Sequence, residues 1–233
     1  MILSPLIVKY LNGDKMSVLS VTVRAQLMVC SDGYEVQGRR RVSGGIADLV
    51  DIRPKVVVPK SNAYRTVLVD DLAGIWRSLI QTHNRSLVAR DDTVARQLVE
   101  FCNLYGLPNP IGAKSHGSGS SAPLSNALVE AKRMSQAIAT CQGDFIEVPD
   151  DVHAALATAV EESVRTQGRL VSLELQNALL AGWFALANRL VNKSEGDWGE
   201  CDFCGGLRFA CAGSRFCSHY CRDRNKKKMA RAK

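Results

Sequence analysis

The 233-residue sequence lacks an apolar run long enough to cross a membrane. A bilayer-spanning helix needs about 20 consecutive apolar residues, so we expect no membrane-embedded segment. The opening residues Met1–Tyr10 have neither a basic leader nor a recognisable cleavage site, so we expect no signal peptide. No internal repeat is evident, and the composition, with 46% apolar and 23% charged residues, is ordinary for a globular protein.

Motifs of catalysis are also missing. The sequence has no nucleophile elbow and no phosphate-binding loop, because Gly117-Ser118-Gly119 is too short and lacks a flanking strand and helix. His83, His116 and His153 each stand alone, without a partner that would make an acid–base pair. No set of residues meets the requirements of a catalytic site, so we predict that the protein is not an enzyme.

Cysteine is distributed unevenly. Five of the eight cysteines fall in the last 33 residues, whereas Cys30, Cys102 and Cys141 are scattered singly. This clustering favours metal-bound thiolates in a reducing cytoplasm over the disulfides of a secreted protein. We interpret the three scattered cysteines as small buried apolar residues, and we expect a cytoplasmic location.

The clustered cysteines have the spacing of a zinc site. Cys201 and Cys204 form a Cys-x2-Cys pair, twelve residues follow, and Cys217 and Cys221 form a Cys-x3-Cys pair. The first pair can present two sulfurs from one tight turn, and the second pair faces one way on the first turn of a helix that Ser218 can cap. Zinc takes four thiolates in a tetrahedron. The spacing therefore predicts one Zn²⁺ per chain, held by these four cysteines.

Two further residues lie close to this predicted site in sequence. Cys211 stands midway in the connecting loop and could replace an expected ligand, while His219 is adjacent to the helical turn but points away from the two cysteines there. We interpret both as bystanders. The alternative to a metal site is a set of free or disulfide-bonded cysteines. A catalytic zinc keeps an open coordination position, and four cysteine ligands leave none.

Positive charge is concentrated in the same segment. The chain carries 30 Lys and Arg against 23 Asp and Glu, a net charge of +7, and residues 201–233 alone carry nine basic and two acidic residues. Residues 1–200 are therefore neutral overall, and the basic segment favours a polyanion such as nucleic acid. The predicted nucleic-acid contacts are Arg215, Arg222, Arg224, Lys226, Lys227, Lys228, Arg231 and Lys233. They lie on several faces of a helix, which suits phosphates better than bases.

Residues 1–69 are predicted to be β-rich. Residues 18–27 are rich in β-branched side chains, Ser31-Asp32-Gly33 is a turn signal, and residues 34–37 can form the returning strand. Residues 56–58 read as a short extended piece between two prolines.

Residues 70–193 are predicted to form a helical core, because the apolar period becomes helical there. The apolar stripes indicate helices that carry Leu72–Ile80, Val94–Tyr105, Leu124–Ile138, Val152–Val164 and Leu170–Asn192. The acidic pairs at residues 70–71, 91–92 and 150–151 are interpreted as helix caps. Trp76, Trp183 and Phe184 could line a ligand pocket, but plain core packing is favoured.

These segments give the predicted fold. We expect an α+β protein, mainly α, in which a β-rich segment (1–69) and a helical core (70–193) precede a zinc finger with a basic helix (194–233). The finger is expected to be treble-clef- or ribbon-like, with a sixteen-residue flexible loop, Gly106–Ser121, inside the helical core.

The residues around the second cysteine pair resemble a known zinc-finger ending. The run Arg215–Arg222 resembles the Arg-x-Phe-Cys-Ser-x-x-Cys-Arg-x-Arg tail of bacterial zinc-finger proteins, most closely the CGNR-type group. Phe203-Cys204-Gly205 with Phe209 resembles the start of that finger, and Cys221–Arg224 shares its first and last residues with Cys-Gly-Asn-Arg. The resemblance implies a transcriptional regulator with a helical ABATE-like domain, metal ligands at the four cysteines, and DNA binding.

Two functions therefore stay open at this point. The first is a zinc-finger DNA-binding regulator whose helical body senses a signal or forms a homodimer. The alternative is a zinc-stabilised module that binds protein or RNA without DNA specificity. Tyr220 is the one aromatic residue near the basic segment that could stack on single-stranded RNA.

Overall fold

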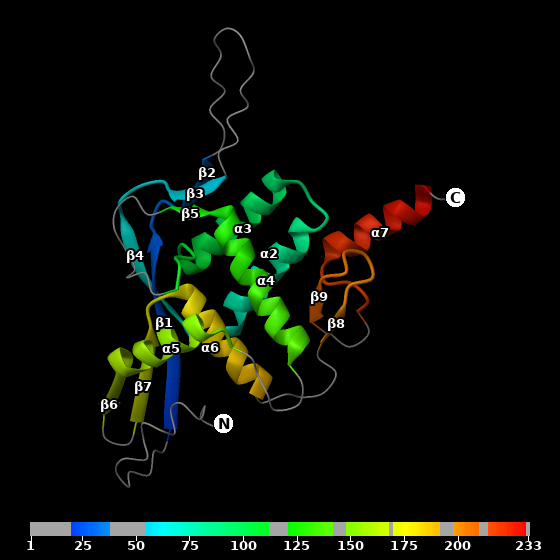
Figure 1. The fold of residues 1–233 in the computed structure, drawn as a ribbon. Helices are drawn as coiled ribbons and strands as arrows, with labels where there is room; N and C mark the ends of the chain where they lie inside the picture. Colours follow the sequence, from blue (N-terminus) through cyan, green and yellow to red (C-terminus); the bar gives the residue numbers. More distant parts are fainter. Residues whose placement is uncertain are drawn as a thin grey trace.

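The fold is organised around the long strand β1 (Ser20–Cys30), which lies inside a four-stranded sheet in the order β4-β1-β7-β6. The computed structural model describes residues 20–37, 55–111, 121–141, 148–167, 170–191, 198–209 and 214–231. It shows a mixed α/β protein in which small sheets and helices pack together (Figure 1). The described residues between 20 and 191 are called the body below.

Two neighbours flank β1 in opposite directions. Strand β4 (Tyr64–Val69) pairs with it antiparallel, and β7 (Leu170–Leu175) pairs with it parallel, with Ser20 opposite Leu170 and Ala25 opposite Leu175. Strand β6 (Val164–Gln167) then pairs antiparallel with β7. The sheet thus joins strands from both sides of the boundary expected between residues 69 and 70.

A second, smaller sheet has the order β2-β3-β5. It consists of β2 (Tyr34–Gln37), β3 (Val56–Pro59) and β5 (Ala122–Pro123). The predicted strand at residues 34–37 and the predicted turn before it are present, with Gly33 at φ 81°. The strand does not return along β1, however, because it pairs with β3.

Five helices of the body supply most of the core: α2 (Ala73–Ser86), α3 (Asp91–Tyr105), α4 (Leu124–Thr140), α5 (Asp150–Ser163) and α6 (Ala178–Val191). Helix α2 is central and packs against α3, α4 and α6. Trp76 of α2 and Trp183 of α6 are each 1% exposed, and Phe184 is also buried, so the prediction of core packing is confirmed. Each such large apolar side chain contributes about 1.5–3 kcal/mol on burial. No described helix has the length and apolar character that a membrane span requires.

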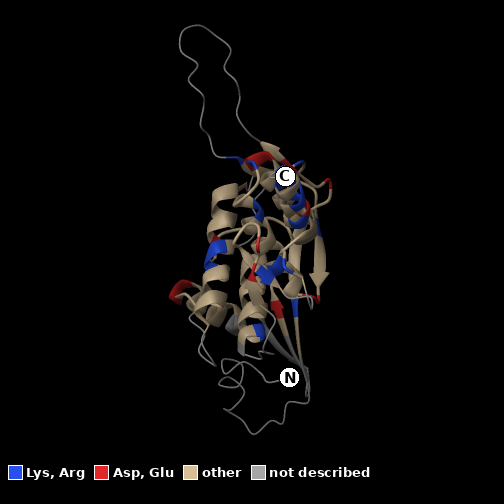
Figure 2. Ribbon diagram, turned by 90° about the vertical axis from the view of Figure 1, so that its right-hand side faces the viewer, with Lys and Arg blue, Asp and Glu red and all other residues tan. Residues whose placement is uncertain are grey.

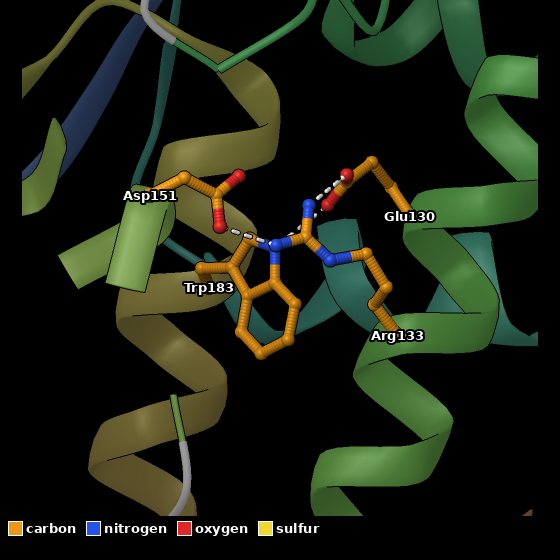
Figure 3. A network of polar contacts seen from close by, with 4 residues as sticks. All are labelled: Glu130, Arg133, Asp151 and Trp183. Atoms are coloured by element: carbon orange, nitrogen blue, oxygen red, sulfur yellow. Dashed lines mark hydrogen bonds and ion pairs between the residues drawn. The ribbon is translucent and has the colours of Figure 1, made fainter. Parts of the chain in front are cut away.

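A polar network joins α4, α5 and α6 at one side of this core (Figure 3). The indole Nε1 of Trp183 donates a hydrogen bond to Oε2 of Glu130 at 3.1 Å. Arg133, one turn along α4, bonds Oε1 of Glu130 and also Oδ1 of Asp151 at the start of α5, each at 2.5 Å. The half-buried guanidinium therefore satisfies two carboxylates from two helices.

One long predicted helix is wrong in its first part. The apolar pattern indicated a helix over Leu170–Asn192, but residues 170–175 form strand β7 beside β1, and the helix begins only at Ala178. Asn177 sets this start, because its Oδ1 accepts hydrogen bonds from the backbone N–H groups of Leu179 at 2.9 Å and Leu180 at 3.2 Å. The preceding helix is also shorter than predicted, since α5 ends at Ser163 and residue 164 starts β6.

The acidic pairs predicted to cap α2 and α3 do not occupy the N-cap positions. The N-cap of α2 is Leu72, without a side-chain cap, although Asp71 Oδ1 accepts a hydrogen bond from the backbone N–H of Ala73 at 3.2 Å. Helix α3 likewise has Arg90 at its N-cap, without a side-chain cap, and Asp91 and Asp92 lie inside its first turn. The capping predictions for these two pairs are therefore wrong. The carboxylates of Asp91 and Asp92 still interact favourably with the positive end of the α3 dipole. Of the predicted loop Gly106–Ser121, residues 112–120 lie outside the described residues.

Candidate metal centre

The four cysteines predicted as ligands lie in a small C-terminal unit. It consists of the antiparallel strands β8 (Trp198–Glu200) and β9 (Leu207–Phe209), followed by the helix α7 (His219–Arg231). The described residues 198–209 and 214–231 are called the cysteine module below. Figure 1 shows this module beside α2, with α7 pointing away from the body.

The first cysteine pair is held by the turn between β8 and β9. The N–H of Cys201 donates to the carbonyl of Gly206, and the N–H of Gly205 donates to the carbonyl of Cys201, each at 2.9 Å. Gly205 has φ 68°, a left-handed conformation that glycine adopts without steric cost. The N–H of Gly206 also points at Cys204 Sγ, 3.4 Å away. Two sulfurs therefore project from one tight loop.

The second pair is held by the start of α7. Ser218 Oγ accepts a hydrogen bond from the N–H of Cys221 at 3.3 Å, so the predicted cap is confirmed. Asp202 connects the two pairs. Its backbone N–H donates a hydrogen bond to the backbone carbonyl of Arg215 at 3.1 Å, and its carboxylate forms an ion pair with the guanidinium of Arg215 at 2.5 Å. These contacts bring Cys217 and the first helical turn against the β8–β9 loop.

The four sulfurs form one group. The Sγ atoms of Cys201, Cys204, Cys217 and Cys221 all lie within 4.8 Å of one another. Cys204 and Cys217 are 3.6 Å apart, Cys217 and Cys221 are 3.5 Å apart, and all four are free thiols. Four sulfurs at about 2.3 Å from a central zinc ion would be separated by about 3.8 Å. The donor set therefore fits a tetrahedral metal ion.

The crowding of thiols also affects their protonation. The hydrogen bond between Cys217 and Cys204 lowers the pKa of Cys204 to about 5. The pKa of Cys217 is raised, because its hydrogen bond to Cys204 favours the thiol and because a second thiolate would be repelled. Burial raises the pKa of Cys221 to about 11. Without a cation the group therefore cannot carry four thiolates near neutral pH, whereas a bound divalent ion favours them.

The residues next to this group differ in their placement. His219 is exposed and does not belong to the sulfur group found among the described residues. Cys211 lies outside the described residues. Cys30 and Cys102 are buried in the body as predicted, and burial raises the pKa of the Cys102 thiol. Cys141, at the end of α4, is only partly buried, so the prediction is wrong for this residue.

The module docks on α2 of the body, a contact that the sequence analysis did not predict. The rings of Trp198 and Phe209 lie 5.6 Å and 5.0 Å from the ring of Trp76, and 5.5 Å from each other. Asn84, 1% exposed, donates from Nδ2 to the carbonyl of Leu207 at 2.6 Å. Trp76, Ile80 and Asn84 follow one another at intervals of four residues and therefore lie on one side of α2. An amide at the end of this apolar row was the one sequence signal that could have indicated a docking partner for α2.

The predicted basic contacts fall into three groups. Arg215 and Arg222 form ion pairs inside the module, with Asp202 and Asp223. Lys233 lies outside the described residues. The others lie along α7 and are exposed: Arg224, Lys226, Lys227, Lys228 and Arg231. Figure 2, in which α7 points toward the viewer, shows these cations in blue along the helix.

Comparison of the chain with models of protein families, with curated proteins and with solved structures found no match. The account of this site therefore depends on its geometry and chemistry.

Proposed function

We propose that the cysteine module binds one zinc ion and presents α7 to DNA, so that the protein acts as a DNA-binding regulator. The observation that carries this proposal is the position of the sulfur group at the base of the basic helix. Two of its ligands, Cys217 and Cys221, belong to the segment that starts α7. An ion held there fixes both the fold of the module and the direction in which the cations point.

The chemistry of the donors supports zinc. Soft thiolates select zinc or iron–sulfur centres over magnesium or calcium, and four sulfurs on one centre indicate a tetrahedral ion. A β-hairpin that supplies one cysteine pair and a helix start that supplies the other is the arrangement of a treble-clef-like finger. When bound, zinc supplies structural cross-links only, because four cysteines leave no coordination position for a substrate.

The charge of α7 supports nucleic acid as the partner. Five exposed cations lie on a helix of 13 residues, and two of the three acids in the described part of the module, Asp202 and Asp223, pair with Arg215 and Arg222 instead. About five phosphate contacts would make log affinity fall with log salt at a slope of about −4.5. The body would then sense a signal or form a homodimer.

A binding series on the full chain tests this proposal. We expect the zinc-loaded protein to retard a DNA duplex in a gel-shift assay, and we expect a chelator to abolish the shift. Changing Lys226, Lys227 and Lys228 together to Ala lowers the affinity about tenfold or more at 0.15 M salt. Binding that neither the chelator nor the triple variant changes would contradict the proposal. A protein partner that stays bound after nuclease treatment, with no affinity for DNA, would favour the protein-binding alternative.

A further inference from the structure

The single aromatic side chain at the start of α7 is covered by positive charge. The guanidinium carbon of Arg85, in the last turn of α2, lies 5.0 Å from the ring centroid of Tyr220, and that of Arg224 lies 5.3 Å away. Arg224 Nε also donates to Tyr220 Oη at 3.1 Å. The ring therefore supports two cations instead of lying open for a nucleobase to stack on.

The helical period extends this positive charge along α7. Residues three, four and seven apart lie on one side of a helix, so Tyr220, Arg224, Lys227, Lys228 and Arg231 share one side. Lys226 lies on the other side, more than 90° away from the centre of this row. All four cations of the row are exposed. Together with Arg85 they form what we call the basic stripe: Arg85, Arg224, Lys227, Lys228 and Arg231.

Docking of the module makes this stripe continuous across two parts of the chain. The ring contacts of Trp76 with Trp198 and the hydrogen bond from Asn84 to Leu207 fix the module on the helix that carries Arg85. Among the ion pairs found within the described residues, none involves a cation of the stripe; they involve Lys55, Arg133, Arg215 and Arg222. The stripe is therefore available to an external anion.

We propose that the basic stripe is the surface that contacts the phosphates of double-stranded DNA, and that Arg85 of the body is part of it. This inference depends on the DNA-binding function proposed above. From Tyr220 to Arg231 the stripe extends over about 16 Å of helix. A duplex presents one phosphate per about 1.7 Å of its axis, so the stripe meets enough phosphates for each of its cations. The Tyr220 ring already contacts two guanidinium groups, which favours phosphate contacts with a duplex over base stacking with a single strand.

The test compares matched variants of the zinc-loaded full chain, with fluorescence anisotropy on a short DNA duplex of arbitrary sequence. Each phosphate contact contributes about fivefold to affinity near 0.15 M salt and about 0.9 to the salt slope. We expect Lys227→Ala to lower affinity about fivefold and to reduce the slope by about 0.9. Lys60→Ala removes an exposed lysine that follows β3, outside the stripe and the cysteine module; it is the control and should change affinity less than about twofold.

A second matched pair tests the contribution of the body. Arg85→Ala should weaken binding by a similar factor, about fivefold. Arg65→Ala removes an exposed arginine on β4, at the opposite side of the molecule from α7 in Figure 1, and should leave the affinity unchanged. Arg85→Lys keeps the charge and should restore most of the affinity, which a purely structural loss at this position would not show. Zinc content and thermal unfolding confirm that each variant is folded.

Three results would overturn the inference. Equal losses for Lys60→Ala and Lys227→Ala would show that affinity depends on the net charge of the protein and not on the position of the cation. An unchanged affinity for Arg85→Ala would exclude the body from the surface. Tighter binding to single strands than to the duplex would show that Tyr220 is free to stack. Failure of the unaltered protein to bind any DNA would instead refute the proposed function itself.

Discussion

In the body, the buried positions are filled by large apolar side chains, whereas in the described part of the cysteine module they are filled by thiols. Trp76, Leu79 and Trp183 are each at most 1% exposed, and they belong to one continuous core of sheet and helices. In the described part of the module, the buried side chains are Cys201, 2% exposed, and Cys221, 1% exposed. A unit of this size that buries so little apolar surface needs another source of stability, and the sulfur group can supply it through a metal ion.

The two regions also meet, so their stabilities are connected. Trp198 and Phe209 of the module complete the surroundings of Trp76, whose burial therefore depends partly on docking. The comparison leads us to expect that the module folds only with a bound ion, whereas the body needs the module only to cover one side of α2.

The largest expected effect comes from breaking the sulfur group. We expect Cys204→Ser, or removal of the metal, to unfold residues 198–231, because the apparent free energy of zinc binding in such units is about 10–16 kcal/mol and is gained on folding. The body should stay folded, with increased solvent exposure of Trp76. Hydrogen exchange resolved by segment measures both effects. Cys141→Ser changes a cysteine outside the sulfur group and is the control; it should leave the hydrogen-exchange protection of both regions intact. Loss of protection throughout the body after Cys204→Ser would contradict the account.

An intermediate effect should follow from separating the two regions without touching the sulfurs. A Cβ at Gly206 would overlap Oδ1 of Asn84 and lie 2.7 Å from its Cγ. We therefore expect Gly206→Ala to lower the free energy of unfolding of the docked protein by about 1–3 kcal/mol, the usual cost of overpacking. Zinc content should stay unchanged. Denaturant unfolding followed by tryptophan fluorescence measures the change.

The second variant of this experiment removes the clashing group. In the Asn84→Ala background, Gly206→Ala should cost much less, because the nearest remaining atom is the Cβ of residue 84 at 3.2 Å. If the changes in the free energy of unfolding caused by Gly206→Ala and Asn84→Ala were additive, residue 206 of the module would not contact Asn84 of α2.

The smallest expected effect lies within the body, at the network in Figure 3. The hydrogen bond from Arg133 lowers the pKa of Asp151 in the folded protein. The ion pair therefore stabilises the fold at pH values above the ordinary aspartate pKa of about 3.9, and this stabilisation is lost as the pH falls through the lowered pKa of the folded state. Asp151 is 60% exposed, so Asp151→Asn should cost at most about 1 kcal/mol near neutral pH. Thermal unfolding at a series of pH values should show the difference between the two proteins vanishing in acid. A difference that persists there would mean that the ion pair is not its cause.

The sequence predicts the group of four sulfurs better than it predicts the fold, because that group is local. The spacing of Cys201, Cys204, Cys217 and Cys221 and the cap at Ser218 depend on one tight turn and one helical turn, and both are confirmed. Apolar periodicity likewise predicts α2, α3 and α4 correctly, since their buried positions repeat with the helical period.

The failures concern contacts between distant parts of the chain. Strand β7 forms because residues 170–175 pair with β1, far away in sequence, and leucines spaced like a helical stripe do not reveal such a partner. The pairing of β2 with β3 was missed for the same reason. The role of Asn84 depends on a carbonyl in β9 that only the folded module brings into reach.

The most direct test of the central claim is the metal content of the purified full chain, combined with titration of its thiols. The account predicts one zinc ion per chain, replaceable by cobalt with the absorption of a tetrahedral thiolate complex. It also predicts four thiols that become reactive only after chelation and a stoichiometry that falls in Cys204→Ser. The account would be contradicted if the folded protein contained no metal and if the four thiols of the module reacted with a thiol reagent without a chelator.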